Sequence, residues 1–346
     1  MNKEVVVITG GGTGGHLKIA DTLTNEFIKA GVNVVFIGSI NGQDKTWFEN
    51  DDRFLDTLFL NTRGVVNKGK IGKVLSLLNM FLKAISCIKV FKKYNVTKVI
   101  SVGGFSAAPA TFASIINSKI SSKCDLYIHE QNSVLGKLNQ VTKKYAKEIF
   151  SSYLDSSIIK DYPVDIKFFE NARIRKEIKT IGFFGGSQGA KAINDFAIST
   201  AKELNAKGIK IIHQTGKNDF NRIKKIYDEL GIQADVFDFT KDFISKMNEC
   251  DFCVSRAGAS TLWELAANNL PALFIPYKYA AANHQYYNAK NLLDKNLCFL
   301  KNEDELKKED LLEVLNCDIE KISTGLKVSI HKDGASKIVK TILENW

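Results

Sequence analysis

The hydrophobic and polar positions of this chain alternate between short apolar runs and longer segments with apolar residues at helical spacing. In the first half, the apolar runs lie at residues 5–9, 34–37, 98–102 and 125–129. Each run has the length of a buried strand. A helix is expected from about His16 to Ala30, ended by Gly31. This alternation predicts a parallel sheet with helices on both faces.

The same alternation restarts in the second half. Strands are expected at residues 180–184, 210–213, 236–239, 252–255 and 272–276, with helices between them, one of which starts at about Thr261. Two glycine turns occupy equivalent places: ITGGGTGGH (8–16) ends the first strand of one half, and FFGGSQGA (183–190) ends that of the other. We therefore predict an α/β protein with two Rossmann-like, doubly wound domains that face each other across a cleft.

Length and cysteine content agree with two domains in a reducing compartment. The chain has 346 residues, of which 45% are hydrophobic, and this exceeds the usual size of one domain. The start MNKEVVVITGGG breaks into glycine after one short apolar run, so we expect no secretory signal and a cytosolic protein. Cys250 and Cys253 form a CxxC without a second ligand pair, and we expect them to be reduced, buried and structural.

The net charge of +10 is concentrated in one segment that contains no acidic residue. This segment runs from Thr57 to Cys124 and carries Arg63, Lys68, Lys70, Lys73, Lys83, Lys89, Lys92, Lys93, Lys98, Lys119 and Lys123. Such clustering points to an anionic partner, either a lipid surface or nucleic acid. Nucleic acid would favour more aromatic residues than the segment offers.

An apolar stripe lies within the same basic segment. Its members recur at helical spacing and are expected to pack in the core: Val74, Leu75, Leu78, Phe81, Leu82, Ile85 and Ile88. Leu77 and Met80 fall off the stripe, and Val65, Val66 and Ile71 lie among lysines. We expect these residues to form outward apolar surface inside a cationic rim.

The first glycine turn admits more than one interpretation. Gly10, Gly12 and Gly15 satisfy the GxGxxG dinucleotide fingerprint, but the following strand lacks the acid that holds ribose, and no acid occurs before Asp44. No Gly-Lys-Ser/Thr follows, so a Walker loop is excluded. The turn is then either a set of backbone N–H groups suited to an anion, next to the His16 imidazole, or a tight turn capped by a polar residue.

Further motifs, far apart in sequence, complete a constellation with ITGGGTGGH. They are GGFSAAPA (103–110), HEQNSVLGKLN (129–139), GGSQGA (185–190), SRAGASTLWELAANNLPALFIPY (255–277) and AAANHQYYNAKNL (280–292). In order and spacing they closely resemble the MurG family of N-acetylglucosaminyltransferases, over essentially the whole chain. The resemblance implies a GT-B fold with a membrane-facing acceptor domain at 1–172 and a UDP-GlcNAc domain at 173–332. It also implies a helix in 333–346 that returns to the first domain.

The resemblance assigns the donor site to particular residues. Glu264 lies in the first turns of a helix and is expected to accept the ribose hydroxyls, although compensation of the helix dipole is an equal interpretation of that carboxylate alone. Arg175 is expected to balance phosphate charge, although it is the only residue kept from the family's usual Gly-Asn-Pro-Val-Arg linker. The other implied donor contacts are Thr13, Gly14, Gly15, Ser187, Gln188, Thr240, Ser260, Thr261, His284, Gln285 and Asn288.

The acceptor side is expected in the first domain. His16 is the candidate catalytic base that orients or deprotonates the attacking sugar hydroxyl, and Glu130 is its rival. His16 as a helix cap and Glu130 as a residue that only fixes its loop remain alternatives. The acceptor contacts implied by the resemblance are Gly103, Gly104, Phe105, Glu130 and Asn132.

These assignments predict an inverting transfer of GlcNAc from UDP-GlcNAc to undecaprenyl-diphosphoryl-MurNAc-pentapeptide (lipid I), which gives lipid II. The product serves peptidoglycan synthesis, and through it cell shape and division. No cofactor and no metal are expected, with helix dipoles and Arg175 stabilising the departing diphosphate.

The lipid-linked acceptor favours an anionic membrane over nucleic acid as the partner of segment 63–98. We expect a peripheral protein at the cytoplasmic face of the cell membrane, which other cell-wall synthesis proteins could bind. The nearer alternative function is a UDP-sugar transferase acting on diacylglycerol. More distant alternatives are a dinucleotide-dependent oxidoreductase and a basic nucleic-acid-binding protein without enzymatic activity.

Overall fold

The computed structural model of the chain describes residues 4–62, 70–121, 124–186, 188–240 and 242–344, with side chains from Asn79 onward in the third of the helices. The chain divides into two compact units. Unit 1 comprises Met1–Val164 and Asp333–Trp346, and unit 2 comprises Asp165–Lys332. The division precedes the boundary expected at residue 172 because the short helix that follows Val164 packs in unit 2, where Asn268 Nδ2 donates to Phe168 O (3.2 Å).

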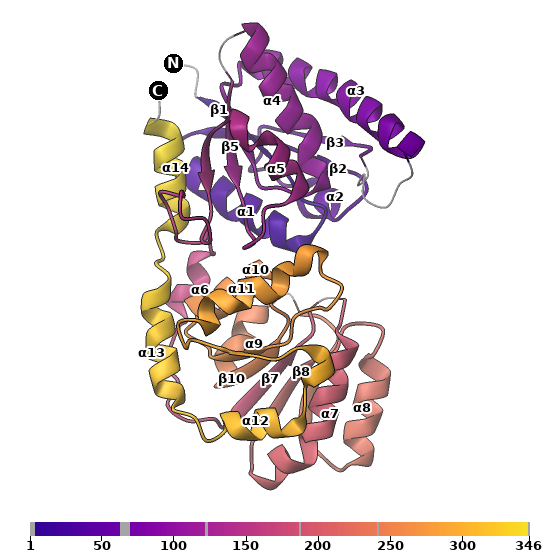
Figure 1. Ribbon diagram of the computed structural model, residues 1–346, viewed down its shortest axis with the longest axis vertical. Coiled ribbons are helices and arrows are strands. Elements are labelled where there is room, and N and C mark those ends of the chain that lie inside the picture. Colours follow the sequence, from indigo (N-terminus) through magenta and orange to yellow (C-terminus); the bar gives the residue numbers. More distant parts are fainter. Residues whose placement is uncertain (1–3, 63–69, 122–123, 187, 241, 345–346) are drawn as a thin grey trace. The chain divides into compact units, whose positions relative to one another are not determined.

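Unit 1 is a doubly wound α/β unit in which helices flank a central sheet (Figure 1). Within the described residues the sheet has six strands in the order β3-β2-β1-β4-β5-β6, and neighbouring strands are parallel. The elements of unit 1 are β1 (Val5–Thr9), α1 (Gly14–Lys29), β2 (Asn33–Ser39), α2 (Asp44–Phe48), β3 (Asp56–Leu60), α3 (Lys70–Tyr94), β4 (Lys98–Ser101), η1 (Phe105–Ala107), α4 (Ala108–Ser121), β5 (Asp125–His129), α5 (Lys137–Thr142), η2 (Lys143–Tyr145), β6 (Ala146–Phe150) and α14 (Gly334–Glu344).

Unit 2 repeats this architecture. Its described sheet has the order β12-β11-β10-β7-β8-β9, again with parallel neighbours, which is the same winding read from the opposite edge. The elements of unit 2 are α6 (Ile166–Glu170), β7 (Thr180–Phe184), α7 (Lys191–Ala206), β8 (Lys210–Gln214), α8 (Phe220–Glu229), β9 (Ala234–Phe237), α9 (Phe243–Glu249), β10 (Phe252–Ser255), α10 (Ala259–Ala267), β11 (Ala272–Phe274), η3 (Ala281–Asn283), α11 (His284–Leu293), β12 (Phe299–Leu300), η4 (Glu303–Glu305), α12 (Lys308–Val314) and α13 (Ile319–Ser329).

The central strands of each unit are completely buried, as parallel strands covered on both faces must be. Val7 and Val99 of unit 1 and Ile181 and Val254 of unit 2 are fully buried. Each lies in a separate apolar cluster built from the sheet and the helices over it. This confirms the predicted fold class of two doubly wound α/β domains. Because neighbouring strands are parallel, the loops that follow their carboxyl ends lie at one edge of each sheet.

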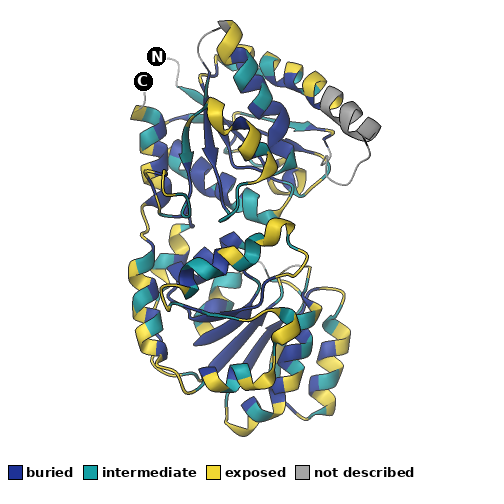
Figure 2. Cartoon of the chain, viewed as in Figure 1, coloured by how far each residue is buried: buried dark blue, intermediate teal, exposed yellow. Residues whose placement is uncertain are grey.

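Helix α3 presents its apolar residues differently from the prediction. Phe81 (56%), Leu82 (63%) and Ile85 (44%) were expected to pack in the core and are exposed (Figure 2). Met80, expected to face outward, is buried, as are Ala84, Cys87 and Phe91, which follow at helical spacing. Small residues at two of these positions allow α3 to pack closely on α4. Ile88, the last residue of the predicted stripe, packs against the core as expected. The other stripe and rim side chains, from Val65 to Leu78, lie outside the described residues.

Candidate active site

The first glycine turn lies at the point where the strand order of unit 1 reverses, between β1 and β4. Gly11 N–H donates to the carbonyl of Gly103 in the loop after β4 (3.1 Å). Gly104 has φ of +82°, and a Cβ on it would overlap the Gly11 carbonyl. Gly12 lies against Phe105, whose Cε1 would be 2.5 Å from a Cβ at that position. The structure therefore brings the predicted loop 103–105 against the first glycine turn.

A buried carboxylate is hydrogen-bonded to the backbone of this turn. Asp44 begins helix α2 and is fully buried. Its Oδ1 accepts from Gly12 N–H (2.5 Å) and its Oδ2 from Ser39 N–H (2.9 Å). A Cβ on Gly11 would lie 2.5 Å from Asp44 Oδ1, so only glycine fits there. Asp44 thus binds the glycine turn itself and cannot hold a ribose as the dinucleotide fingerprint requires, which removes the basis for an oxidoreductase.

His16 is the third residue of α1 and is held at both ring nitrogens. Its Nδ1 lies 3.0 Å from Thr13 Oγ1, and its Nε2 lies 2.8 Å from Gln131 Nε2. Thr13 is the N-cap residue of the helix, so the capping position is not occupied by His16. A Cβ on Gly103 would be 3.3 Å from the His16 ring. The imidazole is therefore part of a fixed arrangement that joins the loops after β1, β4 and β5.

Glu130, the rival base, is buried and committed to its own loop. Its carboxylate accepts from Asn132 N–H (3.0 Å), Gly136 N–H (2.8 Å) and Asn139 Nδ2 (2.8 Å). All three donors belong to the loop 132–139, so both oxygens of the carboxylate are engaged within that loop. This geometry supports the alternative in which Glu130 fixes the HEQN loop, and it leaves His16 as the better-placed proton acceptor.

The second glycine turn lies at the equivalent reversal in unit 2, between β7 and β10. Gly185 N–H donates to Gln214 O (3.3 Å) at the end of β8, and Gly189 packs on the backbone of Thr215. Behind this contact, Asn194 of α7 donates to Thr215 O (3.0 Å). Gln188 is exposed, while Ser187 lies outside the described residues.

A buried polar network continues from Asn194. Its Oδ1 lies 3.0 Å from Nε2 of His213, whose Nδ1 lies 3.1 Å from the Tyr227 hydroxyl. The Asn194 amide also donates to Asp219 Oδ2 (2.7 Å). Burial lowers the pKa of His213 to about 3, so the ring is neutral within this network. The second glycine turn thus rests on the Asn194 amide, which is held by the neutral His213 ring and by the Asp219 carboxylate.

The start of α10 collects the other predicted donor residues of unit 2. Glu264 and Ser260 are buried, and Thr261 is half-buried. Gly258 is the N-cap residue, and a Cβ on it would meet no atom of the structure within 4 Å, so the approach to the first turn is open. The N–H groups of such a turn attract an anion.

The segment after β11 lies beside this helix start. Arg256 donates to Ile275 O (3.0 Å) and Pro276 O (3.2 Å) and forms an ion pair with Glu303. Asn288 is fully buried and donates to Ala257 O (3.2 Å), so it secures the loop before α10. Asn288 therefore stabilises the loop before α10 from the interior of unit 2.

Three further predicted residues of unit 2 are His284 and Gln285, at the start of α11, and Thr240, after β9. Gln285 Oε1 accepts from Tyr277 N–H (2.9 Å), and His284 Nδ1 lies 2.9 Å from Ala281 O. Thr240 lies after β9, where its hydroxyl accepts from Asp242 N–H (3.1 Å). All three are partly exposed, which leaves them in reach of a ligand.

The chain matches two protein-family models. Residues 6–151 match the glycosyltransferase family 28 N-terminal domain, and residues 180–342 match the glycosyltransferase family 28 C-terminal domain. The chain belongs to glycosyltransferase family 28. It is accordingly a glycosyltransferase.

Relatives over the full length agree with this family. The chain is 50% identical to "UDP-N-acetylglucosamine--N-acetylmuramyl-(pentapeptide) pyrophosphoryl-undecaprenol N-acetylglucosamine transferase" of Campylobacter jejuni subsp. doylei, covering 98% of each chain. A protein of the same name from Sulfurovum sp. is 46% identical, with 99% of this chain and 98% of the relative covered.

Solved structures support the fold. The crystal structure of Acinetobacter baumannii MurG matches with a TM-score of 0.79 at 21% identity, covering 99% of both chains. A UDP-glucose: anthocyanidin 3-O-glucosyltransferase in complex with UDP matches with a TM-score of 0.69 at 12% identity, covering 99% of this chain and 100% of the other. Both have the two-domain GT-B architecture predicted for this glycosyltransferase family 28 member.

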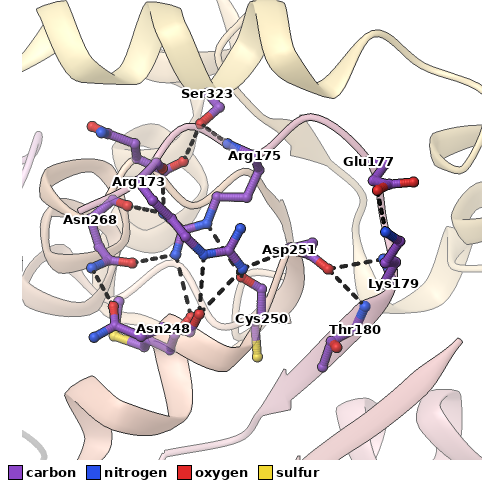
Figure 3. Close-up of polar contacts among 12 residues, drawn as sticks. Arg173, Arg175, Glu177, Lys179, Thr180, Asn248, Cys250, Asp251, Asn268 and Ser323 are labelled. Carbon is purple, nitrogen blue, oxygen red and sulfur yellow. Dashed lines mark hydrogen bonds and ion pairs between the residues drawn. The ribbon is translucent and has the colours of Figure 1, made fainter. Parts of the chain in front are cut away.

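Arg175 is placed differently from the expected phosphate ligand of this family 28 protein (Figure 3). Its side chain is fully buried and donates to backbone and amide oxygens, among them Cys250 O (3.3 Å), Asn268 Oδ1 (2.6 Å) and Arg173 O (2.9 Å). Burial lowers the pKa of the guanidinium to about 10. The geometry does not support direct diphosphate contact, because the N–H groups are already committed to the interior. Arg175 instead fixes the segment that leads into β7.

Sequence reasoning missed three residues that organise the family 28 site. Asp44 was named only as an acid that comes too late in the sequence to hold a ribose. Gln131 appeared within the HEQN motif without a role, and Asn194 was not considered. The HEQN run was a usable signal for Gln131, since a polar side chain directly after a strand end lies where ligands bind. Asp44 and Asn194 gave no such signal because neither directly follows a strand, and each begins or lies within a helix.

Two further findings concern membranes and metals. No helix in the described part of this family 28 chain combines the length and apolar character needed to cross a bilayer. Among the described residues, no group of three or more His, Cys, Asp or Glu side chains is arranged to hold a metal ion. Cys250 and Cys253 are buried, as predicted, and burial raises the pKa of both thiols.

Proposed function

We propose that this protein transfers GlcNAc from UDP-GlcNAc to the C4 hydroxyl of MurNAc in undecaprenyl-diphosphoryl-MurNAc-pentapeptide, forming lipid II. The observation that carries the proposal is the full-length relationship to transferases named for this reaction, at 50% identity. A diacylglycerol acceptor has no comparable support. The reaction belongs to peptidoglycan synthesis.

Unit 2 is proposed to bind the donor. The open N-terminal turn of α10 and the second glycine turn offer backbone N–H groups to the diphosphate, with Ser260, Thr261 and Gln188 beside them. Glu264 accepts hydrogen bonds from the ribose hydroxyls, and His284 and Gln285 contact the GlcNAc group. The helix N-termini stabilise the negative charge that develops on UDP as the glycosidic bond breaks.

Unit 1 is proposed to bind the acceptor and to supply the base. His16 takes the proton of the C4 hydroxyl as its oxygen attacks C1 of GlcNAc from the face opposite UDP, which inverts that carbon. Asn132 and the loop 103–105 hold the acceptor beside His16. The Gly12 amide is taken by Asp44, so this N–H group is not available to a ligand.

Membrane docking is proposed for the outer face of α3. Phe81, Leu82 and Ile85 are exposed there, with Lys89 and Lys92 exposed on the same helix. Each basic residue close to an anionic bilayer contributes about 1 kcal/mol. Lys98, counted with this segment from the sequence, is buried and paired with Glu4 (2.5 Å), so it does not contribute.

Vesicle sedimentation tests the docking proposal. The double substitution Phe81→Ser and Leu82→Ser should abolish binding to vesicles that contain anionic lipid, because it removes apolar area from the contact. The matched control is Val328→Ser, which removes an equally exposed apolar side chain in unit 2 (72%) and should bind normally. Equal binding by both variants would contradict docking through α3.

Transfer of labelled GlcNAc to a short-chain lipid I analogue tests the reaction. The native protein should be active with EDTA present, Glu264→Ala should raise the donor KM, and His16→Ala should lower kcat by at least about 100-fold. Lys202→Ala on the exposed face of α7 is the control and should be unchanged. Transfer to diacylglycerol in place of lipid I would contradict the proposed acceptor and leave the donor assignment intact.

A further inference from the structure

Gln131 is the residue whose side chain meets the candidate base from the neighbouring strand loop. It lies directly after β5 and is buried (7% exposed), and its Nε2 is 2.8 Å from Nε2 of His16. The opposite ring nitrogen faces the Thr13 hydroxyl at 3.0 Å. Both ring nitrogens of His16 therefore have a polar partner, and these partners decide which nitrogen carries the proton.

The amide orientation decides which nitrogen of the ring carries the proton. With the amide N–H₂ facing His16, Nε2 must accept, so the ring proton lies on Nδ1 and is donated to Thr13 Oγ1. The other end of the amide, Gln131 Oε1, is buried without a hydrogen-bond partner among the described residues. Turning the amide around would place two N–H donors at that position instead of one oxygen, and buried donors without acceptors are costly. The orientation with N–H₂ toward His16 is therefore favoured.

The ionisable groups around His16 do not compete with Gln131 for this position. The carboxylate of Glu130 is occupied by three donors of its own loop, and that of Asp44 by the amides of Gly12 and Ser39. His129, the residue two positions before Gln131, is kept neutral, since burial and the nearby His16 lower its pKa to about 3. Gln131 is thus the group in direct contact with Nε2.

We propose that Gln131 is a positioning residue that holds His16 in the Nδ1–H tautomer and keeps Nε2 as the lone pair for the acceptor hydroxyl. This inference rests on the proposed transfer reaction. The acceptor hydroxyl takes the place of the Gln131 amide at Nε2. Its O–H bond then breaks with the proton passing to Nε2, its oxygen forms the bond to C1 of GlcNAc, and UDP leaves with the electron pair of the broken C1–O bond.

The charge at position 131 gives a test that a merely structural role would not satisfy. In Gln131→Glu, a carboxylate of the same shape faces Nε2 and stabilises the imidazolium, so the base form of His16 is reached only at higher pH. The acidic limb of the pH profile of kcat/KM for a lipid I analogue should move up by at least about one pH unit. The donor KM should change by less than about twofold.

Two matched variants complete the design. Gln131→Met keeps the size of the side chain without its hydrogen bond, and should lower kcat about tenfold without the large shift of the acidic limb. Gln140→Glu makes the same chemical change nearby, where the amide is exposed and donates to Leu135 O (2.9 Å), and should behave like the native protein. A Gln131→Glu profile with the native acidic limb would overturn the proposal.

The ring nitrogens can be observed directly by ¹⁵N NMR, whether or not the enzyme turns over. The chain has five histidines, and a His16→Gln variant identifies the signals of His16. The native protein should show the Nδ1–H tautomer at neutral pH, and Gln131→Glu should show an imidazolium under the same conditions. An Nε2–H tautomer in the native protein would overturn the inference, whereas absence of transfer to lipid I together with the Nδ1–H tautomer would overturn only the proposed function.

Discussion

The two glycine turns follow the first strands of two sheets with the same winding, yet they are supported in different ways. The turn of unit 1 is closed by the buried carboxylate of Asp44, which takes the Gly12 amide. The turn of unit 2 rests on the backbone of Thr215, which is held by the amide of Asn194, and the Asp219 carboxylate bonds to that amide. In unit 1 the carboxylate thus takes an N–H group of the turn itself, whereas in unit 2 it takes an N–H group of the supporting side chain.

This difference separates the tasks of two similar sequence motifs. In unit 1, the turn holds an imidazole in place, with Gln131 and Thr13 on either side of His16. In unit 2, the turn and the open start of α10 are the proposed places where backbone N–H groups meet a diphosphate. Glycine spacing alone does not distinguish between the two roles that we propose for these turns.

The largest effect should come from removing the carboxylate below the first turn. Asp44→Ala leaves the buried amides of Gly12 and Ser39 without an acceptor, at a cost of about 1–3 kcal/mol each. The displaced His16 loop should lower kcat/KM for the acceptor by about 100-fold, since small misplacements are costly in catalysis. Steady-state transfer assays measure this, and calorimetry should find UDP affinity unchanged within about twofold.

A control in the same cluster separates loop geometry from general stability. Phe54 packs on Phe48 of α2 (ring centroids 5.1 Å apart) and on Phe36 (5.6 Å) without a hydrogen bond to the turn. Phe54→Leu should reduce thermal stability and leave kcat/KM close to native at 25 °C. If both variants lose activity in proportion to stability, Asp44 has no special part in placing the turn.

The next largest effect should fall on the donor. Asn194→Leu removes the donor to Thr215 O and Asp219 and the acceptor for His213, so the second turn loses its support from below. We expect the donor KM to rise about tenfold with the acceptor KM unchanged. Thr200→Val, at a buried position of the same helix where the hydroxyl bonds within the helix, is the control. A raised acceptor KM in Asn194→Leu would contradict the division between the units.

The central strands could be predicted from sequence, whereas three of the four edge strands could not. The fourth edge strand, β9, was expected at 236–239 and lies at Ala234–Phe237. The strands at 5–9, 125–129 and 180–184 have the predicted bounds, because a strand covered on both faces needs a continuous apolar run. β3, β6 and β12 were not predicted, and they lie at the sheet edges with half-exposed residues that give no such run.

The site could be predicted where chemistry lies in a contiguous motif. His16 and Glu130 were found in this way, but their supports Asp44 and Asn194 depend on contacts across the fold. Arg175 was assigned to phosphate because it matches the arginine of the family's linker motif. Only the structure shows that it is buried and that its N–H groups face carbonyl oxygens. The prediction of which side of α3 faces the core was wrong, because that helix is apolar on more than one side.

A smaller effect separates two glycines of the second turn. Gly186 and Gly189 both have positive φ, +77° and +76°, so alanine at either site carries about 1 kcal/mol of backbone strain. At Gly189 the new methyl group would also overlap Thr215 O, whereas at Gly186 it would meet no atom within 4 Å. Thermal unfolding should show the larger loss for Gly189→Ala. The donor KM should rise for Gly186→Ala only if UDP-GlcNAc occupies that open space. This measurement therefore tests whether the diphosphate lies beside Gly186.

The smallest effect at neutral pH concerns the buried histidine of the second network. His213 has a pKa of about 3 when folded against an ordinary value of 6.5, so the unfolded chain binds the additional proton below pH 6.5. The free energy of unfolding should therefore fall as pH drops from 6.5 toward 3, by up to about 1.4 kcal/mol per pH unit. Urea unfolding across this range should show a weaker dependence for His213→Gln. The same slope in both proteins would mean that His213 titrates normally.

Helix α14 makes unit 1 discontinuous in sequence, and this constrains how the protein is made. Gly334 of α14 lies against Asp161, Lys337 pairs with the same residue (3.1 Å), and α14 packs on α1. During synthesis these residues leave the ribosome only after the whole of unit 2 has emerged. Unit 2 can thus complete its fold as soon as it is translated, while the unit that carries His16 must wait for its last helix. A nascent chain that has emerged from the ribosome only as far as Lys332 would hold a complete unit 2 and an incomplete unit 1.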